Sequence, residues 1–339
     1  MQLPSLTDIE AAAEVVYRHL PPTPQYRWPL LAERLGTTLW LKHENHTPVG
    51  AFKIRGGLSY FEHLRRSGAL PREVVSATRG NHGQSLGFAA RAHGVACTIV
   101  VPRGNSPEKN AAMRALGVSL IEHGEDFQDS VEHAQRLAAE RGAHRVPSFH
   151  PALLDGVATA WWELLRAAPA LEVLYVPIGL GSGACAALAA KRALGHPVRI
   201  VGVVSAHATT YADSLAAARV VEAPATTRLA DGMAVRRADA SALALLAQGL
   251  DHLVTVTDDE VAEAMRTIYT ATHNVAEGAG AAGFAGAMKE RDQLRGRVVG
   301  TTLSGSNVDA AVLSSLLADC AVVRQSHPQD RAERIPAMT

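Results

Sequence analysis

The chain has 339 residues, of which 47% are hydrophobic and 19% are charged, and its 33 basic residues balance its 33 acidic ones. This apolar content indicates a folded globular protein, and the length favours two lobes of one compact body. The even charge disfavours nucleic acid and anionic membrane surfaces as partners. No run of about 18 apolar residues and no basic-then-apolar start occurs, so we expect a cytoplasmic protein without a membrane span or signal peptide.

The first 150 residues alternate between helical and strand patterns. Prolines remove backbone donors, so the proline-rich stretch 21–24 ends the first helix, and Ser106 followed by Pro107 is a strong start for a later one. The patterns predict strands over 38–42, 74–77, 97–102 and 118–121 and helices over 6–19, 55–67, 80–93, 106–117 and 127–141. From residue 74 onward, this order indicates a small doubly wound lobe of parallel strands.

The second half continues the alternation without repeating the sequence. Thr257 and Glu260 form a capping box, which begins a helix. We expect strands over 173–177, 199–204, 253–257 and 297–303 and helices over 157–166, 185–193, 257–272 and 308–319. The polar stretch 324–339 should be held loosely.

Cysteine and histidine positions give little sign of cross-links or metal. Cys97, Cys185 and Cys320 are widely spaced, odd in number and set among apolar residues, so we expect core thiols rather than disulfides or a zinc site. His43 and His46 lie three residues apart, but no further cluster completes a ligand set. The sequence therefore predicts no metal.

The stretch 48–57, Pro-Val-Gly-Ala-Phe-Lys-Ile-Arg-Gly-Gly, presents Lys53 where a loop meets a helix. The small residues Gly50 and Ala51 leave space for a planar ligand, and Phe52 can anchor the backbone. Burial would lower the pKa of such a lysine, and the free amine can form a Schiff base with a carbonyl compound. A solvated lysine at a helix start is the alternative that this stretch alone leaves open.

A glycine loop, Gly-Leu-Gly-Ser-Gly over 179–183, lies between a predicted strand and helix. Its backbone donors and the helix N-terminus suit a phosphate. With Ala184 the loop also fits a permissive dinucleotide pattern, but the next strand ends at Ala206 without the acidic residue that a ribose requires. The loop therefore favours a single phosphate, and a purely structural turn is the alternative.

Two further loops follow predicted strands, where ligands of α/β sheets bind. Thr78 to His82 offers a hydroxyl, an amide, an imidazole and free backbone donors, which suit a carboxylate. Ser304 could form one hydrogen bond with a ring nitrogen. Taken alone, the first loop could be a capped helix terminus and the second an ordinary turn.

The chain resembles the threonine/serine dehydratases of the fold-type II pyridoxal 5'-phosphate (PLP) enzymes. The resemblance covers about 23–322 and depends on motifs that occur in the family's order: the lysine loop, Thr-Arg-Gly-Asn-His-Gly-Gln at 78–84, the glycine loop, Ala-Asp-Gly at 230–232, Glu-Gly-Ala-Gly-Ala at 277–281 and Leu-Ser-Gly-Ser-Asn at 303–307. Six ordered motifs in one chain are far more specific than any one.

The resemblance implies an α/β fold of two lobes, similar to the tryptophan synthase β subunit, with a mostly parallel sheet flanked by helices in each. The large PLP-binding lobe would comprise 1–72 and 148–322, and the small lobe, 73–147, would be inserted into it. The polar tail would be 323–339. Such enzymes are commonly homodimers, although no stretch of this sequence identifies an interface.

Roles for individual residues follow from the same resemblance. Lys53 would hold PLP as a Schiff base and move protons at the substrate's α-carbon, Asn81 would bind the phenolic oxygen, and Ser304 would face the pyridine nitrogen as a neutral hydroxyl. Other cofactor contacts would be Phe52 beside the ring, Gly179, Leu180, Gly181, Ser182 and Gly183 at the phosphate, and Gly232 and Glu277 on the large lobe. The substrate would be bound by Thr78, Arg79, Gly80, Asn81 and His82.

Some positions depart from the family pattern. Leu180 and Ser182 interrupt a run of four glycines, and Thr226 and Thr227 stand where cation-binding members carry a carboxylate. Arg79 occupies the position of the second acid/base of serine racemases, and a guanidinium cannot take a proton. The sequence also lacks the regulatory domain of the biosynthetic dehydratases, which favours a catabolic role.

We therefore expect a PLP-dependent ammonia-lyase that converts a β-hydroxy amino acid, such as L-threonine or L-serine, to the 2-oxo acid and ammonia. Alternative substrates are 3-hydroxyaspartate and phenylserine. Racemisation of serine or β-replacement on the same fold remains open, and a non-catalytic nucleotide-binding protein is the alternative from another class.

Overall fold

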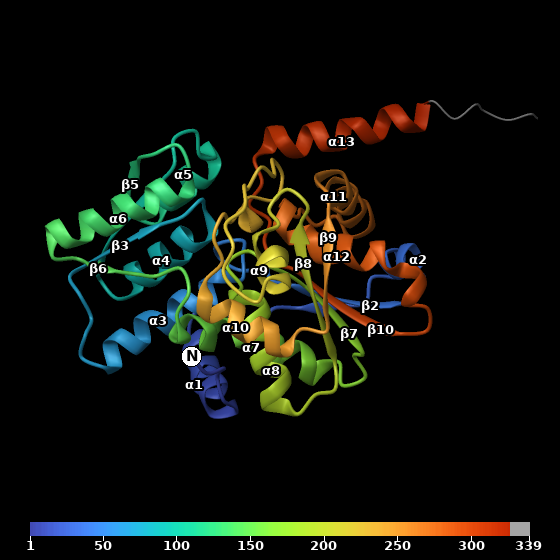
Figure 1. Ribbon diagram of the computed structural model, residues 1–339, viewed down its shortest axis with the longest axis horizontal. Coiled ribbons are helices and arrows are strands. Elements are labelled where there is room, and N and C mark those ends of the chain that lie inside the picture. Colours follow the sequence, from blue (N-terminus) through green and yellow to red (C-terminus); the bar gives the residue numbers. More distant parts are fainter. Residues whose placement is uncertain (326–339) are drawn as a thin grey trace, which may run out of the picture.

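A computed structural model describes residues 1–325, with side chains to residue 318. Two sheets form the framework (Figure 1). The larger sheet has the order β1 (Gln25–Tyr26), β2 (Thr38–His43), β10 (Val298–Leu303), β7 (Val173–Pro177), β8 (Arg199–Ser205) and β9 (His252–Val256). The smaller has the order β5 (Ser119–Glu122), β4 (Ala96–Val101), β3 (Glu73–Ala77) and β6 (His144–Arg145).

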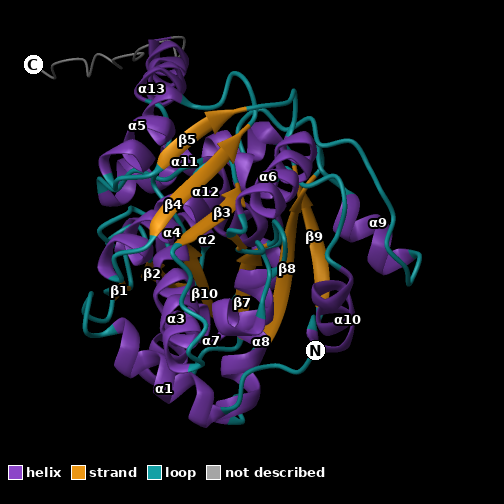
Figure 2. Ribbon diagram, turned by 90° about the vertical axis from the view of Figure 1, so that its left-hand side faces the viewer, coloured by secondary structure: helices purple, strands orange, loops and turns teal. Residues whose placement is uncertain are grey.

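Strand pairing is parallel except between β1 and β2. Parallel strands need crossover connections, and helices supply them on the faces of both sheets (Figure 2). The helices are α1 (Leu6–Val16), α2 (Pro29–Leu35), α3 (Lys53–Arg66), α4 (Asn81–Ala92), α5 (Pro107–Ala115), α6 (Phe127–Arg141), α7 (Pro151–Ala167), α8 (Ser182–Leu194), α9 (Thr210–Ala216), α10 (Ala240–Gly249), α11 (Asp258–Thr272), α12 (Gly278–Lys289) and α13 (Ala310–Gln325).

Local sequence explains most helix starts. The side chain of Ser106 caps α5 by accepting from the backbone N–H of Lys109, and Thr257 and Glu260 form the predicted capping box of α11. The strand β7 and the helix α6 have the predicted bounds. These elements were predictable because their caps and apolar patterns agree.

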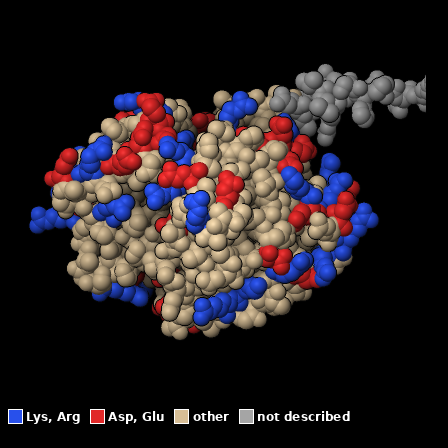
Figure 3. All heavy atoms as spheres, viewed as in Figure 1, with Lys and Arg blue, Asp and Glu red and all other residues tan. Residues whose placement is uncertain are grey.

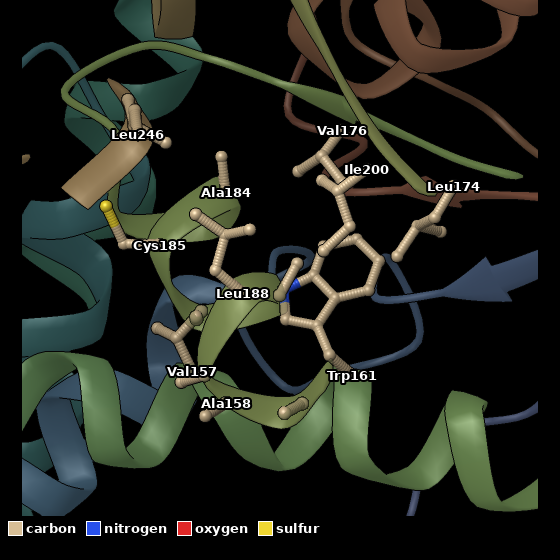
Figure 4. Packing of buried hydrophobic residues seen from close by; sticks show 14 of the residues in the cluster. Val157, Ala158, Trp161, Leu174, Val176, Ala184, Cys185, Leu188, Ile200 and Leu246 are labelled. Carbon is tan, nitrogen blue, oxygen red and sulfur yellow. The ribbon is translucent and has the colours of Figure 1, made fainter. Parts of the chain in front are cut away.

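One core cluster of the larger sheet lies between α7, α8 and the strands β7 and β8 (Figure 4). Trp161 of α7 extends toward Leu188 of α8 and toward Ile200 on the sheet, and all three side chains are buried. The alanines of α8 keep that helix close to its neighbours. Since interiors are tightly packed, the cluster fixes the start of α8, where the glycine loop lies.

The opposite face of the larger sheet is covered by α11 and α12, whose buried residues include Phe284 and Ile268. The sequence did not predict α12, because its four glycines lower helix propensity. A side chain at Gly280 would meet the carbonyl oxygen of Gly305, and one at Gly283 would meet the Thr301 hydroxyl. Close packing therefore requires these glycines and stabilises a helix that propensity disfavours. The short helices α2, α9 and α10 were also missed.

Several predicted bounds were wrong. The helix α1 ends at Val16 rather than 19, and α7 begins at Pro151, six residues before the predicted start, because proline fits the first helical position. Residues 323–325 belong to α13 rather than to a polar tail, and the rest of that predicted tail, 326–339, lies outside the described residues.

Cys97 and Cys185 are buried free thiols, as expected, and the side chain of Cys320 lies outside the described part. Burial raises the pKa of both buried thiols to about 12, so they stay protonated at neutral pH. Within residues 1–325, no helix is both long and apolar enough to cross a membrane. Basic and acidic side chains are mixed over the face in Figure 3, in keeping with the even charge.

The strands of the smaller sheet all lie within 73–145, between the proposed lobe boundaries near 72 and 147. The division into a large lobe, 1–72 with 148–322, and a small lobe, 73–147, stays a prediction that this arrangement supports. The helix α3 packs against α4 on one side and α7 on the other, so it links the two sheets.

Candidate active site

A single pocket contains every residue predicted for the site. It lies where β3, β7 and β10 end, so loops from both sheets contribute to it. The predicted residues among its lining are Phe52, Lys53, Thr78, Arg79, Gly80, Asn81, His82, Gly179, Leu180, Gly181, Ser182, Gly183, Gly232, Glu277 and Ser304.

Lys53 is the first residue of α3. The loop before it pairs with the loop after β10, because Ala51 bridges Gly305 and the Phe52 N–H donates to the Ser304 carbonyl at 3.0 Å. The Lys53 Nζ donates to the Ser182 Oγ at 2.7 Å and lies 5.0 Å from the centre of the Phe52 ring. Desolvation lowers the pKa of Lys53 to about 8, so a usable fraction of the amine is neutral near physiological pH.

The glycine loop enters α8. Gly181 has a φ of 93°, in the left-handed region that glycine tolerates best, and a side chain at Gly179 would meet the carbonyl oxygen of Gly232. Tyr211 fixes the loop by donating its hydroxyl to the Leu180 carbonyl at 2.8 Å. The first backbone N–H groups of α8 therefore remain available for an anion such as a phosphate.

The loop after β3 enters α4. Its backbone is held by Thr78, whose hydroxyl oxygen accepts from the Gly80 N–H at 3.0 Å. His82 is buried, and its Nε2 has no hydrogen-bond partner among the described residues. Burial, together with the nearby Lys53, lowers the pKa of His82 to about 3, so its imidazole is neutral at physiological pH.

Asn81 joins this loop to the larger sheet. Its amide nitrogen donates to Glu277 at 2.5 Å, and its amide oxygen accepts from Asn307 at 2.8 Å. Burial raises the pKa of Glu277. The side chain of Ser304 makes only a long contact of 3.4 Å with the Ala279 carbonyl, so its hydroxyl is available to a ligand.

Lys109 and Asp231 also line the pocket, and the sequence interpretation missed their part in it. The Lys109 Nζ lies 3.1 Å from Asp231 and 3.6 Å from Glu277, which links α5 to the larger sheet. Burial alone would lower the pKa of Lys109, but the two carboxylates raise it. One sequence signal could have placed Lys109 in the site. It lies in the first turn of the helix that begins after Ser106, beyond the end of β4.

A buried cluster of charged side chains lies around Arg55 in the first turn of α3, and no sequence pattern predicted it. Arg55 is fully buried and donates to Glu44, Glu163, Thr159 and Thr23. Lys42, also fully buried, donates to Glu163 at 2.5 Å. We call Lys42, Glu44, Arg55 and Glu163 the buried charge cluster; its two positive and two negative charges balance.

No group of three or more histidine, cysteine, aspartate or glutamate side chains within the described residues could hold a metal ion. Thr227, at the position that departs from the cation-binding members, instead donates its hydroxyl to Asp258 at 2.6 Å. His43 is buried, and its Nε2 accepts a hydrogen bond from the Trp28 Nε1–H at 2.9 Å.

Known proteins resemble this chain along most of its length. An L-threonine ammonia-lyase of Geobacter sulfurreducens is 35% identical over 84% of this chain and 70% of its own length. An L-threo-3-hydroxyaspartate ammonia-lyase of Saccharomyces cerevisiae is 30% identical over 94% of this chain and 97% of its own length. The solved structure of threonine deaminase isoform 2 from Solanum lycopersicum covers 92% of this chain and 91% of that chain, with 27% identity and a TM-score of 0.85.

The family model described as "Pyridoxal-phosphate dependent enzyme" matches residues 16–305, which contain both sheets and the whole pocket. This span includes the lysine loop, the loop before α4, the glycine loop and Ser304. The predicted fold type and cofactor are thereby confirmed. The chain belongs to the family of pyridoxal-phosphate dependent enzymes.

Proposed function

We propose that the chain catalyses β-elimination from a β-hydroxy amino acid and so acts as an ammonia-lyase. The observation that carries this proposal is Lys53, an amine with a pKa lowered to about 8 in a pocket lined by anion-binding loops. The relatives named for L-threonine and for L-threo-3-hydroxyaspartate support a substrate of this kind.

The pocket fits PLP, because each part of the cofactor meets a matching group. Lys53 would hold the aldehyde carbon, the first turn of α8 with Ser182 would bind the phosphate, and Asn81 would bind the phenolic oxygen. Ser304 would face the ring nitrogen. When bound, PLP draws electron density away from the substrate's α-carbon, which makes the α-proton acidic.

The side chains of the pocket then share the remaining work. Lys53, released when the substrate amine replaces it, would take the α-proton, and the Ser182 hydroxyl beside it offers a short path for that proton. The backbone donors at the start of α4 would hold the substrate carboxylate. Loss of the α-proton and the β-hydroxyl as water leaves an enamine, which hydrolyses to the 2-oxo acid and ammonia.

Elimination is favoured over racemisation by Arg79. Racemisation requires a group on each face of the α-carbon that both gives and takes a proton, and a guanidinium cannot take one. Ser304 presents a hydroxyl rather than a carboxylate, so it would not hold a proton on the ring nitrogen. A short-lived carbanion is sufficient for elimination, which suits such a site.

The test measures ammonia and 2-oxo acid from the purified protein supplied with PLP and either L-threonine or L-serine, with chiral analysis of the remaining amino acid. We expect oxo acid and ammonia in equal amounts and no D-serine. D-serine forming as fast as pyruvate would overturn the elimination assignment, and a thiol adduct would identify β-replacement instead.

We also propose that the protein is a homodimer in the cytoplasm. The family resemblance supports the first statement and the even composition of the sequence the second. Light scattering of the purified protein and fractionation of cells test them.

A further inference from the structure

Arg79 is the charged residue of the pocket that its neighbours leave unsatisfied. Its side chain lines the pocket, and its Nε is buried without a hydrogen-bond partner among the described residues. No carboxylate within the described part of the chain forms an ion pair with it. A buried donor on a charged group is costly when it is unpaired, so an unsatisfied guanidinium at a binding site indicates a missing anionic partner.

The other cations of the pocket are already occupied. Lys109 contacts both Asp231 and Glu277, and Lys53 donates to Ser182 and is the amine proposed to hold PLP. The positive charge of Arg79 is therefore the one left over for a ligand. Its loop is fixed by the hydrogen bond between the Gly80 N–H and Thr78, so the guanidinium is presented from a defined backbone.

The planar fork of a guanidinium matches a carboxylate, which it can bind through two parallel hydrogen bonds. In the proposed function, the backbone donors at the start of α4 would bind the α-carboxylate of the substrate. We propose that Arg79 binds a second carboxylate, carried on the β-carbon, and that the preferred substrates are 3-hydroxy amino acids with an acidic side chain. This inference rests on the proposed function and names its substrate class.

Kinetics test the inference through the ratio of kcat/KM for L-threo-3-hydroxyaspartate to that for L-threonine. We expect the wild-type ratio to exceed about 10² and Arg79→Ala to lower it about 100-fold, which corresponds to about 2.8 kcal/mol, because a charged hydrogen-bonded pair is lost. Arg79→Lys should give an intermediate ratio because it keeps the charge and loses the fork. Arg91→Ala, which removes an exposed arginine from the other end of α4, is the matched control and should leave the ratio unchanged.

A simpler role for Arg79 gives a different pattern. If Arg79 bound the α-carboxylate, Arg79→Ala would lower kcat/KM for both substrates equally and leave their ratio unchanged. That result would overturn the inference. A wild-type enzyme that prefers L-threonine would also overturn it.

Binding without turnover separates this inference from the proposed function. Succinate and butyrate have carbon chains of the same length, but succinate has a second carboxylate and butyrate does not. Neither has an amine that could react with PLP. Calorimetry on the PLP-loaded protein should show succinate binding at least about tenfold more tightly than butyrate, with the difference lost in Arg79→Ala and kept in Arg91→Ala. Equal binding of the two acids would contradict the inference even if elimination is found. Absence of elimination from any β-hydroxy amino acid would contradict the proposed function and the substrate class, and a kept preference for succinate would then show a second-carboxylate site at Arg79 alone.

Discussion

Arg55, in the lysine loop, and Arg79, in the loop before α4, differ in their surroundings. Arg55, two residues after Lys53, is fully buried and surrounded by acceptors in the buried charge cluster. Arg79 has no partner among the described residues, although its Nε is buried. The satisfied arginine holds the fold together, and the unsatisfied one is available to a ligand. Hydrogen-bond saturation thus distinguishes these two arginines.

The same contrast applies to lysines. Lys42 and Lys109 both contact carboxylates, whereas Lys53 contacts only a hydroxyl and an aromatic ring. Carboxylate neighbours raise the pKa of an amine and oppose desolvation, which outweighs them at Lys42 but not at Lys109. At Lys53 desolvation acts without a carboxylate neighbour and lowers the pKa to about 8, and this amine also lines the pocket. The comparison therefore predicts that substitutions in the buried charge cluster affect stability and that substitutions in the pocket affect activity.

The largest effect is expected for Lys53→Ala. Removal of the amine should lower kcat/KM for elimination at least about 10⁴-fold, the upper range for loss of a proton-transfer group, because the same amine holds the cofactor. The free energy of unfolding should change by less than about 1 kcal/mol, because this lysine forms no ion pair with any residue that the structure describes. Turnover of the variant at the wild-type rate would remove Lys53 from the mechanism.

Arg55→Met should affect stability rather than the chemistry of the pocket. Leaving Glu44 and Glu163 buried without their partner should lower the free energy of unfolding by about 3–5 kcal/mol in denaturant titrations. Arg103→Ala is the control, because the exposed pair of Arg103 and Glu125 should contribute at most about 1 kcal/mol. Equal losses of unfolding free energy in the two variants would show that the buried charge cluster stabilises the fold no more than an exposed ion pair does.

A smaller effect is expected at Ser304. Ser304→Ala should weaken PLP binding about tenfold and slow turnover, because one neutral hydrogen bond is lost and the fold is kept. Ser304→Asp should favour a protonated ring and change the partition between elimination and other products. Ser306→Ala, in the same loop but outside the pocket lining, should bind PLP as the wild type does. Unaltered affinity and kinetics in both Ser304 variants would exclude this residue from the site.

Local patterns allowed much of the site to be predicted. Lys53, the glycine loop and Ser304 follow strands or begin helices. Because loops at the carboxyl ends of parallel strands converge, their meeting in one pocket could be predicted without knowledge of distant contacts. The helix α6 was predicted with its correct bounds because an aspartate cap, an apolar pattern and a terminal glycine agree. The six ordered motifs then identified the family.

Contacts between distant segments could not be predicted in this way. Arg55 and Glu163 are 108 positions apart, and Lys109 and Asp231 are 122 apart, so no spacing rule links them. The helix α12 was missed for a related reason, since its glycines are required by neighbours such as Gly305 rather than by the helix itself. Tertiary packing decided these features.

Borohydride reduction of the PLP-loaded protein, followed by peptide mass spectrometry, tests the central claim most directly. Reduction fixes the cofactor to the amine that holds it. We expect the pyridoxyl phosphate group on the peptide containing Lys53 and none on the peptides containing Lys42 or Lys109, whose amines are paired with carboxylates. Labelling of Lys42 or Lys109 in place of Lys53 would contradict the account.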